Sequence, residues 1–183
     1  MDVKNNLIIQ RAKKKRFNVI QGKTQIDSLV DRLPEDGECF KFLSDGGFSS
    51  ICFVLFVADR AKINNLHVSS FRIGKKDIQV MHLLKKKGLL DYAEFALCQF
   101  AKDETGGTFR IVKKVCEENE WHIHTLNNHS KVHLYDTALG KFVLETSSNL
   151  NENPKIEQFS FEKDAELYDF YLEHMFKKGG DEE

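Results

Sequence analysis

The chain alternates between short apolar segments that favour β-strands and amphipathic segments that favour helices, and this alternation most constrains its fold. Strand-like segments, rich in β-branched and aromatic residues, fall at 51–57, 65–71, 92–100, 121–126, 131–136, 142–146 and 156–161. Helical periodicity follows Gly74, Gly107 and Asp164, and Asp164 is the predicted N-cap of the last helix. This order predicts an α/β fold with a mixed β-sheet flanked by helices on both faces.

Two of these strand assignments depend on more than periodicity. The segment 51–57 is almost wholly apolar and rich in β-forming residues, so we predict a central strand buried on both faces of the sheet. The segment 92–100 fits either a strand or a helix. Its place in a series of alternating strands and helices favours a strand.

One polar stretch, residues 129–136, has the pattern H-x-K-x(4)-D. Side chains of a β-strand alternate between its two faces, so His129 and Lys131 are predicted to lie side by side. A nucleophile or base would then stand next to a cation that can hold an anion. Asp136 has the opposite parity, so it is predicted to face away from them and to act as a local brace.

A second polar stretch follows at residues 146–151, with the sequence Thr-Ser-Ser-Asn-Leu-Asn. Ser147 and Asn149 share parity in an extended chain, so a hydroxyl and an amide are predicted to point the same way. Both groups can donate hydrogen bonds to the oxygens of an anion. The two stretches together therefore indicate an anion site with a histidine in it.

These stretches resemble the HKD motif of the phospholipase D superfamily, which reads H-x-K-x(4)-D, then G-S-x-N, then a glutamate that supports the histidine. Glu157 matches that glutamate, and by motif the resemblance covers the last third of the chain. Its surrounding sequence, Asn-Pro-x-Ile-Glu-Gln, is reminiscent of members from phages or mobile elements. Thr146 departs from the usual glycine, and its Cβ limits how closely the backbone can approach a phosphate.

The resemblance implies a phospholipase D-like α-β-α sandwich and a phosphodiesterase activity. His129 would attack phosphorus and form a covalent phosphohistidine, while Lys131 holds the non-bridging oxygens. Ser147 and Asn149 would add hydrogen bonds to those oxygens, and Glu157 would fix the tautomer of His129. The small chain with one HKD copy resembles the endonuclease members, so a nuclease that acts on nucleic acid is expected. This mechanism needs no metal and no cofactor.

A homodimer follows from the same mechanism. One histidine serves as the nucleophile, and a second protonates the leaving oxygen. No other histidine of this chain is followed by a lysine two positions later. A second molecule would therefore supply the partner histidine, with His129 facing its own copy across a two-fold axis.

Two other hypotheses stay open. The first is a nucleic-acid-binding protein on the same fold with weak or lost catalysis, which Thr146 and the net charge of −1 keep in play. The second is a zinc-dependent hydrolase, because His122, His124 and His133 lie close to His129 in sequence and Asp136 could complete a ligand set. The HKD pattern already explains His129, so the metal site is the weaker hypothesis.

Composition sets the remaining expectations for the 183 residues, which we take as a single domain, 1–183, with 1–30 the least determined part and 177–183 a frayed tail. A basic cluster, Arg11, Lys13, Lys14, Lys15 and Arg16, is either a solvated surface or a patch that attracts phosphates. The four cysteines form no C-x-x-C pair, and the longest apolar run is far too short to span a bilayer. A cytoplasmic protein without stable membrane insertion is expected.

Overall fold

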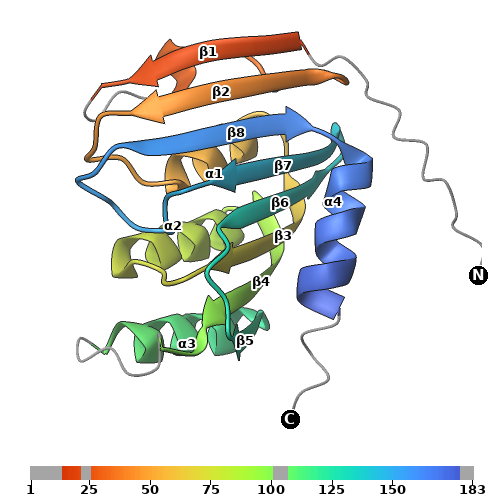
Figure 1. Cartoon of the computed structure of the whole chain (residues 1–183). Coiled ribbons are helices and arrows are strands. Elements are labelled where there is room, and N and C mark those ends of the chain that lie inside the picture. Colours follow the sequence, from red (N-terminus) through yellow and green to blue (C-terminus); the bar gives the residue numbers. More distant parts are fainter. Residues whose placement is uncertain (1–13, 22–25, 101–106, 178–183) are drawn as a thin grey trace, which may run out of the picture.

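The computed structural model describes residues 14–21, 26–100 and 107–177, which form one eight-stranded sheet and the helices that cover it (Figure 1). The strand order in the sheet is β1-β2-β8-β7-β6-β3-β4-β5. The strands are β1 (Lys14–Ile20), β2 (Glu38–Ser44), β3 (Ile63–Ser70), β4 (Leu90–Cys98), β5 (His122–Leu126), β6 (Val132–Thr137), β7 (Gly140–Thr146) and β8 (Glu157–Lys163).

The sheet is mixed, as predicted. The pairs β1/β2, β3/β4 and β4/β5 are parallel, whereas β2/β8, β8/β7, β7/β6 and β6/β3 are antiparallel. These directions bring the carboxyl ends of β2, β3, β4, β5 and β7 to the same edge as the amino ends of β6 and β8. We call this the site edge, because both polar stretches of the sequence lie there.

Helices cover both faces of the sheet, which confirms the predicted layering (Figure 1). On one face lie α1 (Ile51–Ala58), α2 (Lys75–Lys86) and α3 (Thr108–Asn119), whose buried residues belong to the large core cluster. On the other face lie α4 (Ala165–Tyr171) and the π-helical turn η3 (Leu172–Lys177), which pack on Ala96, Val132, Leu134 and Val143. A short 3-10 turn, η1 (Ile26–Ser28), contacts α1.

The predicted central strand at 51–57 is wrong, because this segment forms the helix α1. Its apolar residues surround the helix and are almost all buried, so it lacks the polar face that reveals a helix by its periodicity. Phe53 packs edge-on against Phe42 at 5.3 Å between ring centroids, and it lies 5.3 Å from Phe159. A wholly apolar helix and a strand buried on both faces have the same composition, and only the packing partners separate them.

The other predicted elements are present, with shifts at their ends. The segments at 65–71, 92–100, 121–126, 131–136, 142–146 and 156–161 correspond to β3 to β8. Asp164 caps α4 as predicted, because its Oδ1 accepts a hydrogen bond from the backbone N–H of Leu167 at 2.9 Å. Gly74 is the N-cap of α2, and Gly107, with φ of 65°, is the N-cap of α3. In the described part of the chain, no helix is long and apolar enough to cross a membrane.

Candidate functional site

The two polar stretches meet at the site edge. His129 and Lys131 immediately precede β6, Ser147 follows the last residue of β7, and Glu157 is the first residue of β8. Because β6, β7 and β8 are neighbours in the sheet, residues from two ends of the motif come together although up to 28 positions separate them. The fold therefore supplies the proximity on which the sequence pattern depends.

His129 lies beside Lys131, but not for the predicted reason. The strand β6 begins only at Val132, so alternation along a strand does not place these two side chains. Instead Lys131 turns back, and its Nζ donates a hydrogen bond to the His129 carbonyl oxygen at 2.6 Å and lies 3.3 Å from His129 Nδ1. The ring of Phe71, at the end of β3, packs edge-on against the exposed His129 imidazole at 5.7 Å.

Burial and nearby negative charges have opposite effects on the pKa of Lys131. Burial lowers the pKa of its ammonium, while the carboxylate of Glu157 and, more weakly, the Cys98 thiol raise it. Glu157 is thus close enough to stabilise the positive charge of Lys131 without a direct ion pair between them. A cation held this way remains free to take an anionic ligand.

Glu157 organises the loop that follows β7. Its buried carboxylate accepts hydrogen bonds from Ser147 Oγ and from Asn153 Nδ2. Ser147 Oγ in turn accepts from the backbone N–H of Gln158 at 3.1 Å. The Glu157 carboxylate thus binds these two side chains. The bond that we expected from it to the far ring nitrogen of His129 is absent from the described part of the chain.

Thr146 and Asn149 shape the same loop. The Thr146 hydroxyl donates to the carbonyl oxygen of Gln158 at 2.8 Å and accepts from the N–H of Ser148 at 2.9 Å. The residue that replaces the usual glycine therefore fixes the turn through its side chain. Among the described residues, Asn149 Oδ1 is a buried oxygen without a hydrogen-bond partner, so part of this amide is available to a ligand or a small rearrangement.

Asp136 lies near the opposite end of β6 and does not join the site. Its Oδ2 accepts a hydrogen bond from Asn65 Nδ2 on β3 at 3.0 Å. The two residues are register partners on adjacent strands. Asp136 therefore links β6 to β3 and lies away from His129 and Lys131.

Two serine hydroxyls, of Ser50 and Ser70, form hydrogen bonds to the loop that follows β7. Ser70 Oγ, at the end of β3, accepts from the N–H of Leu150 at 3.1 Å. Ser50 Oγ donates to the Asn149 carbonyl oxygen at 3.4 Å and lies 3.5 Å from His133 Nε2. Ser70 lies within the predicted strand segment 65–71, whereas no local pattern in the sequence indicates the contribution of Ser50.

The histidines of the zinc hypothesis are separated by the sheet. His122 Nδ1 is 2.9 Å from the hydroxyl of Tyr92, and His124 Nδ1 is 3.6 Å from Glu94 Oε1. His133 points to the opposite face, where full burial lowers its pKa to about 3. Within residues 14–21, 26–100 and 107–177, no three His, Cys, Asp or Glu side chains are grouped so that they could hold a metal ion.

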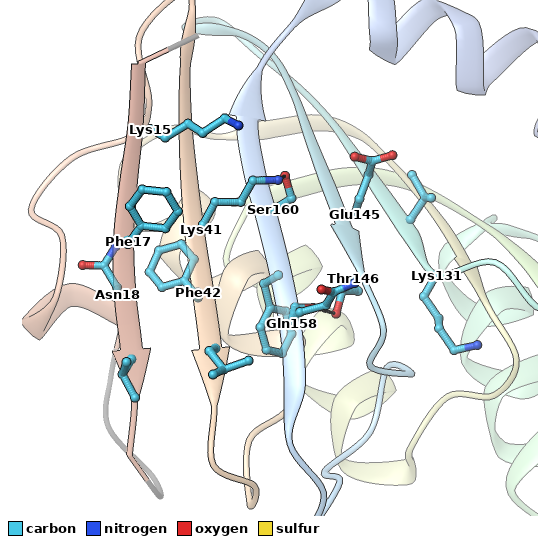
Figure 2. A pocket seen from close by; sticks show the side chains of 14 residues that line it. Lys15, Phe17, Asn18, Lys41, Phe42, Lys131, Glu145, Thr146, Gln158 and Ser160 are labelled. Atoms are coloured by element: carbon cyan, nitrogen blue, oxygen red, sulfur yellow. Dashed lines mark hydrogen bonds between the residues drawn. The ribbon is translucent and has the colours of Figure 1, made fainter.

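The basic cluster is only partly described, because Arg11 and Lys13 lie outside the described residues. The first three residues of β1, an outermost strand of the sheet, are Lys14, Lys15 and Arg16. The Arg16 guanidinium lies 5.3 Å from the centroid of the Phe40 ring. Lys15 instead lines a hollow of about 740 Å³ that extends across neighbouring strands to Lys131 (Figure 2).

The sequence has no match among protein-family profiles or curated proteins, but its fold is similar to solved structures. One is the crystal structure of polyphosphate kinase from Porphyromonas gingivalis, with a TM-score of 0.53 and 13% identity. That match covers 73% of this chain and 24% of the kinase. Another is TrmBL2, an archaeal chromatin protein that binds DNA, with a TM-score of 0.47 and 10% identity. That match covers 86% of this chain and 57% of TrmBL2.

These likenesses concern the fold. The chain spans about a quarter of the polyphosphate kinase it matches, so it corresponds to one part of that enzyme. The mixed sheet with helices on both faces is consistent with the sandwich that the HKD resemblance implied. The assignment of chemistry depends on the side chains at the site edge.

Proposed function

We propose that this protein is a phosphodiesterase of the phospholipase D type and that its substrate is nucleic acid. The observation that carries the proposal is the meeting of His129, Lys131, Ser147 and Glu157 at one edge of the sheet. Lys131 Nζ lies 3.3 Å from His129 Nδ1, so one phosphate could contact both the nucleophile and the cation. Glu157 holds Ser147 in place and supports the charge of Lys131.

The chemistry would proceed in two displacements. A ring nitrogen of His129 attacks phosphorus, the bond to the leaving oxygen breaks, and an acid gives that oxygen a proton. Water then attacks the phosphohistidine and gives its proton to the group that acted as the acid, which frees the imidazole and leaves a phosphomonoester. Lys131 stabilises the negative charge on the non-bridging oxygens in both transition states, while the Ser147 hydroxyl donates its one proton to Glu157 and holds that carboxylate in place.

The acid in this proposal is His129 of a second copy of the chain. Only one H-x-K pair exists in the sequence, and His129 is exposed at the site edge, where a second molecule can approach it. A two-fold axis near this residue would bring two histidines and two lysines around a single phosphate. The site would then be complete only in the homodimer.

A chromogenic phosphodiester assay on the wild type and on His129→Ala tests the proposal. The wild type should turn over substrate, and the variant should lose activity by on the order of 10³-fold or more, as expected for loss of a covalent nucleophile. His129 is exposed, so the variant should keep its fold by circular dichroism. Turnover that survives in His129→Ala would overturn the assignment of the nucleophile.

Mixing the two proteins tests the shared site. If each site needs two His129 side chains, heterodimers with one histidine are inactive, so activity falls as the square of the wild-type fraction. A linear fall, or an active monomer by light scattering, would show that one chain suffices.

A second candidate is a nucleic-acid-binding protein without turnover. The Glu157 carboxylate supports this alternative, because it binds Ser147 and Asn153 and not the His129 ring that a two-step mechanism would orient. Binding of nucleic acid by a wild type that does not hydrolyse the chromogenic substrate would favour this alternative.

A further inference from the structure

The face of the sheet that carries α4 is covered over only part of its width. In the described part of the chain, α4 and η3 pack over strands β3, β4, β6 and β7, whereas no helix lies over this face of β1, β2 and β8 (Figure 1). We call this uncovered part the open half. Three of its apolar side chains are strongly exposed, Phe17 by 77%, Val19 by 56% and Leu43 by 48%. Such a group of exposed apolar side chains marks a contact surface.

The hollow of about 740 Å³ extends from the open half to β7 and to the start of β6, and lysines lie along it (Figure 2). Lys15 comes from β1, Lys41 from β2, and Lys131 stands at the far side beside His129. Lys41 is held in position, because its Nζ donates a hydrogen bond to Ser160 Oγ on β8 at 2.6 Å. Four inter-strand spacings separate β1 from β6, so these two strands lie about 19 Å apart across the sheet.

Negative charge in the hollow is confined to one side. Glu145 is the acidic residue that lines it, and its carboxylate accepts a hydrogen bond from the hydroxyl of Tyr171 at the end of α4. Burial, this hydrogen bond and the nearby carboxylates of Glu145 and Glu162 all raise the pKa of Tyr171. Tyr171 therefore stays a neutral donor that satisfies Glu145, while the ammonium groups of Lys15 and Lys41 face the open half.

We propose that the open half binds single-stranded nucleic acid and leads its phosphates to Lys131 and His129. This inference rests on the proposed phosphodiesterase for its last step, and it names the form of the substrate. Lysines spaced along a groove attract a phosphate backbone, and an exposed aromatic ring offers a surface on which an unpaired base can stack. Phe17 is such a ring, between Lys15 and the apolar side chains of Val19 and Leu43.

The geometry favours a single strand over two other occupants. In a duplex the base faces are stacked inside the helix, so Phe17, Val19 and Leu43 would stay exposed without a partner. A second copy of the chain placed on this face would bring a second set of the same lysines to the contact, and like charges oppose such a contact. A single strand supplies both the negative charge and the unpaired bases.

The test measures binding in the His129→Ala protein, so that hydrolysis plays no part. Fluorescence anisotropy with a labelled oligo(dT) and with a duplex of equal length should show tighter binding of the single strand. Phe17→Ala should weaken single-strand binding by roughly 5- to 100-fold, the loss expected for one base stack. Lys41→Gln should weaken it less and make its salt dependence shallower by about one phosphate contact.

Matched controls use the same substitutions elsewhere. Phe170→Ala removes a phenylalanine that is 54% exposed on α4, and Lys114→Gln removes a lysine on α3, on the other face of the sheet. Both should bind oligo(dT) as the parent protein does. Phe17 is itself 77% exposed, so its replacement should leave the thermal unfolding midpoint unchanged, which a melting curve checks.

Three results would overturn the inference. One is equal binding by Phe17→Ala and the parent protein, and another is equal affinity for duplex and single strand. The third is a dimer in light scattering that Phe17→Ala dissociates while oligo(dT) binding persists, which would assign the open half to a second copy. Strand binding that depends on Phe17, together with a wild-type protein that shows no phosphodiesterase turnover, would instead refute the proposed function and support the binding surface.

Discussion

Histidines at two places on the same sheet show how differently one residue type is used. At the site edge His129 is exposed and lies 3.3 Å from the ammonium of Lys131. Beneath η3, His67 and His124 flank the carboxylate of Glu94, at 3.4 Å and 3.6 Å, and the ring of Phe176 packs against both. The His129 imidazole is therefore accessible to a ligand. At the second place, which we call the covered layer, His67 and His124 instead contact Glu94 beneath η3.

The covered layer illustrates the cost of burial. Desolvation lowers the pKa of His124, and the neighbouring Glu94 only partly opposes this effect. In the described part of the chain, His124 Nε2 is buried and has no hydrogen-bond partner. His124 therefore contributes to packing beneath η3. The candidate catalytic His129 differs from His124 because it is exposed and lies next to a cation.

The comparison predicts that substitutions at the edge change rate without changing stability. Lys131→Met should lower phosphodiester turnover by roughly 10²- to 10³-fold, because it removes a cation that stabilises charge in the transition state. Its free energy of unfolding in urea should stay within about 0.5 kcal/mol of the wild type. Lys113→Met, on the exposed surface of α3, serves as the control with unchanged rate. A loss of stability that parallels the loss of rate would contradict the distinction.

The converse is expected in the covered layer. Phe176 is 4% exposed and packs on His67 and His124, so Phe176→Ala should lower the free energy of unfolding by about 3 kcal/mol. Turnover at 25 °C should remain that of the wild type, because the folded state still dominates. Phe170→Ala, at a 54% exposed position on α4, should cost far less. Equal costs for the two substitutions would mean that η3 does not cover this layer in solution.

A buried histidine on the other face sharpens the comparison through pH. Burial lowers the pKa of His133 from 6.5 to about 3, so between these values the unfolded chain binds a proton that the folded chain does not. This group therefore makes the protein less stable as the pH falls below about 6.5, by up to about 1.4 kcal/mol per pH unit. Urea unfolding at pH 7, 6 and 5 should show a shallower decline for His133→Gln. An unchanged slope would show that His133 is accessible to protons in the folded state.

Local patterns predicted most of the elements, because their signals are complete within a few residues. Alternation identified β6 and β8, and the side chain of Asp164 predicted the start of α4. The segment at α1 was misassigned, since its sequence has no polar side from which to read a period. This segment packs as a helix on the aromatic side chains of β2 and β8. It cannot pair with these strands, because each of them already has a neighbouring strand on both sides.

The candidate site shows the same division. The sequence by itself determined which residues are the candidates for the site, because the spacing of His129, Lys131, Ser147 and Glu157 is a property of the chain. Only the tertiary structure decided how they meet, since the order β8-β7-β6 brings together loops that are far apart in sequence. It also gave Glu157 its partners Ser147 and Asn153 and placed Asp136 far along β6. Hydrogen bonds and burial depend on which strands lie side by side, and a local pattern contains no information about that order.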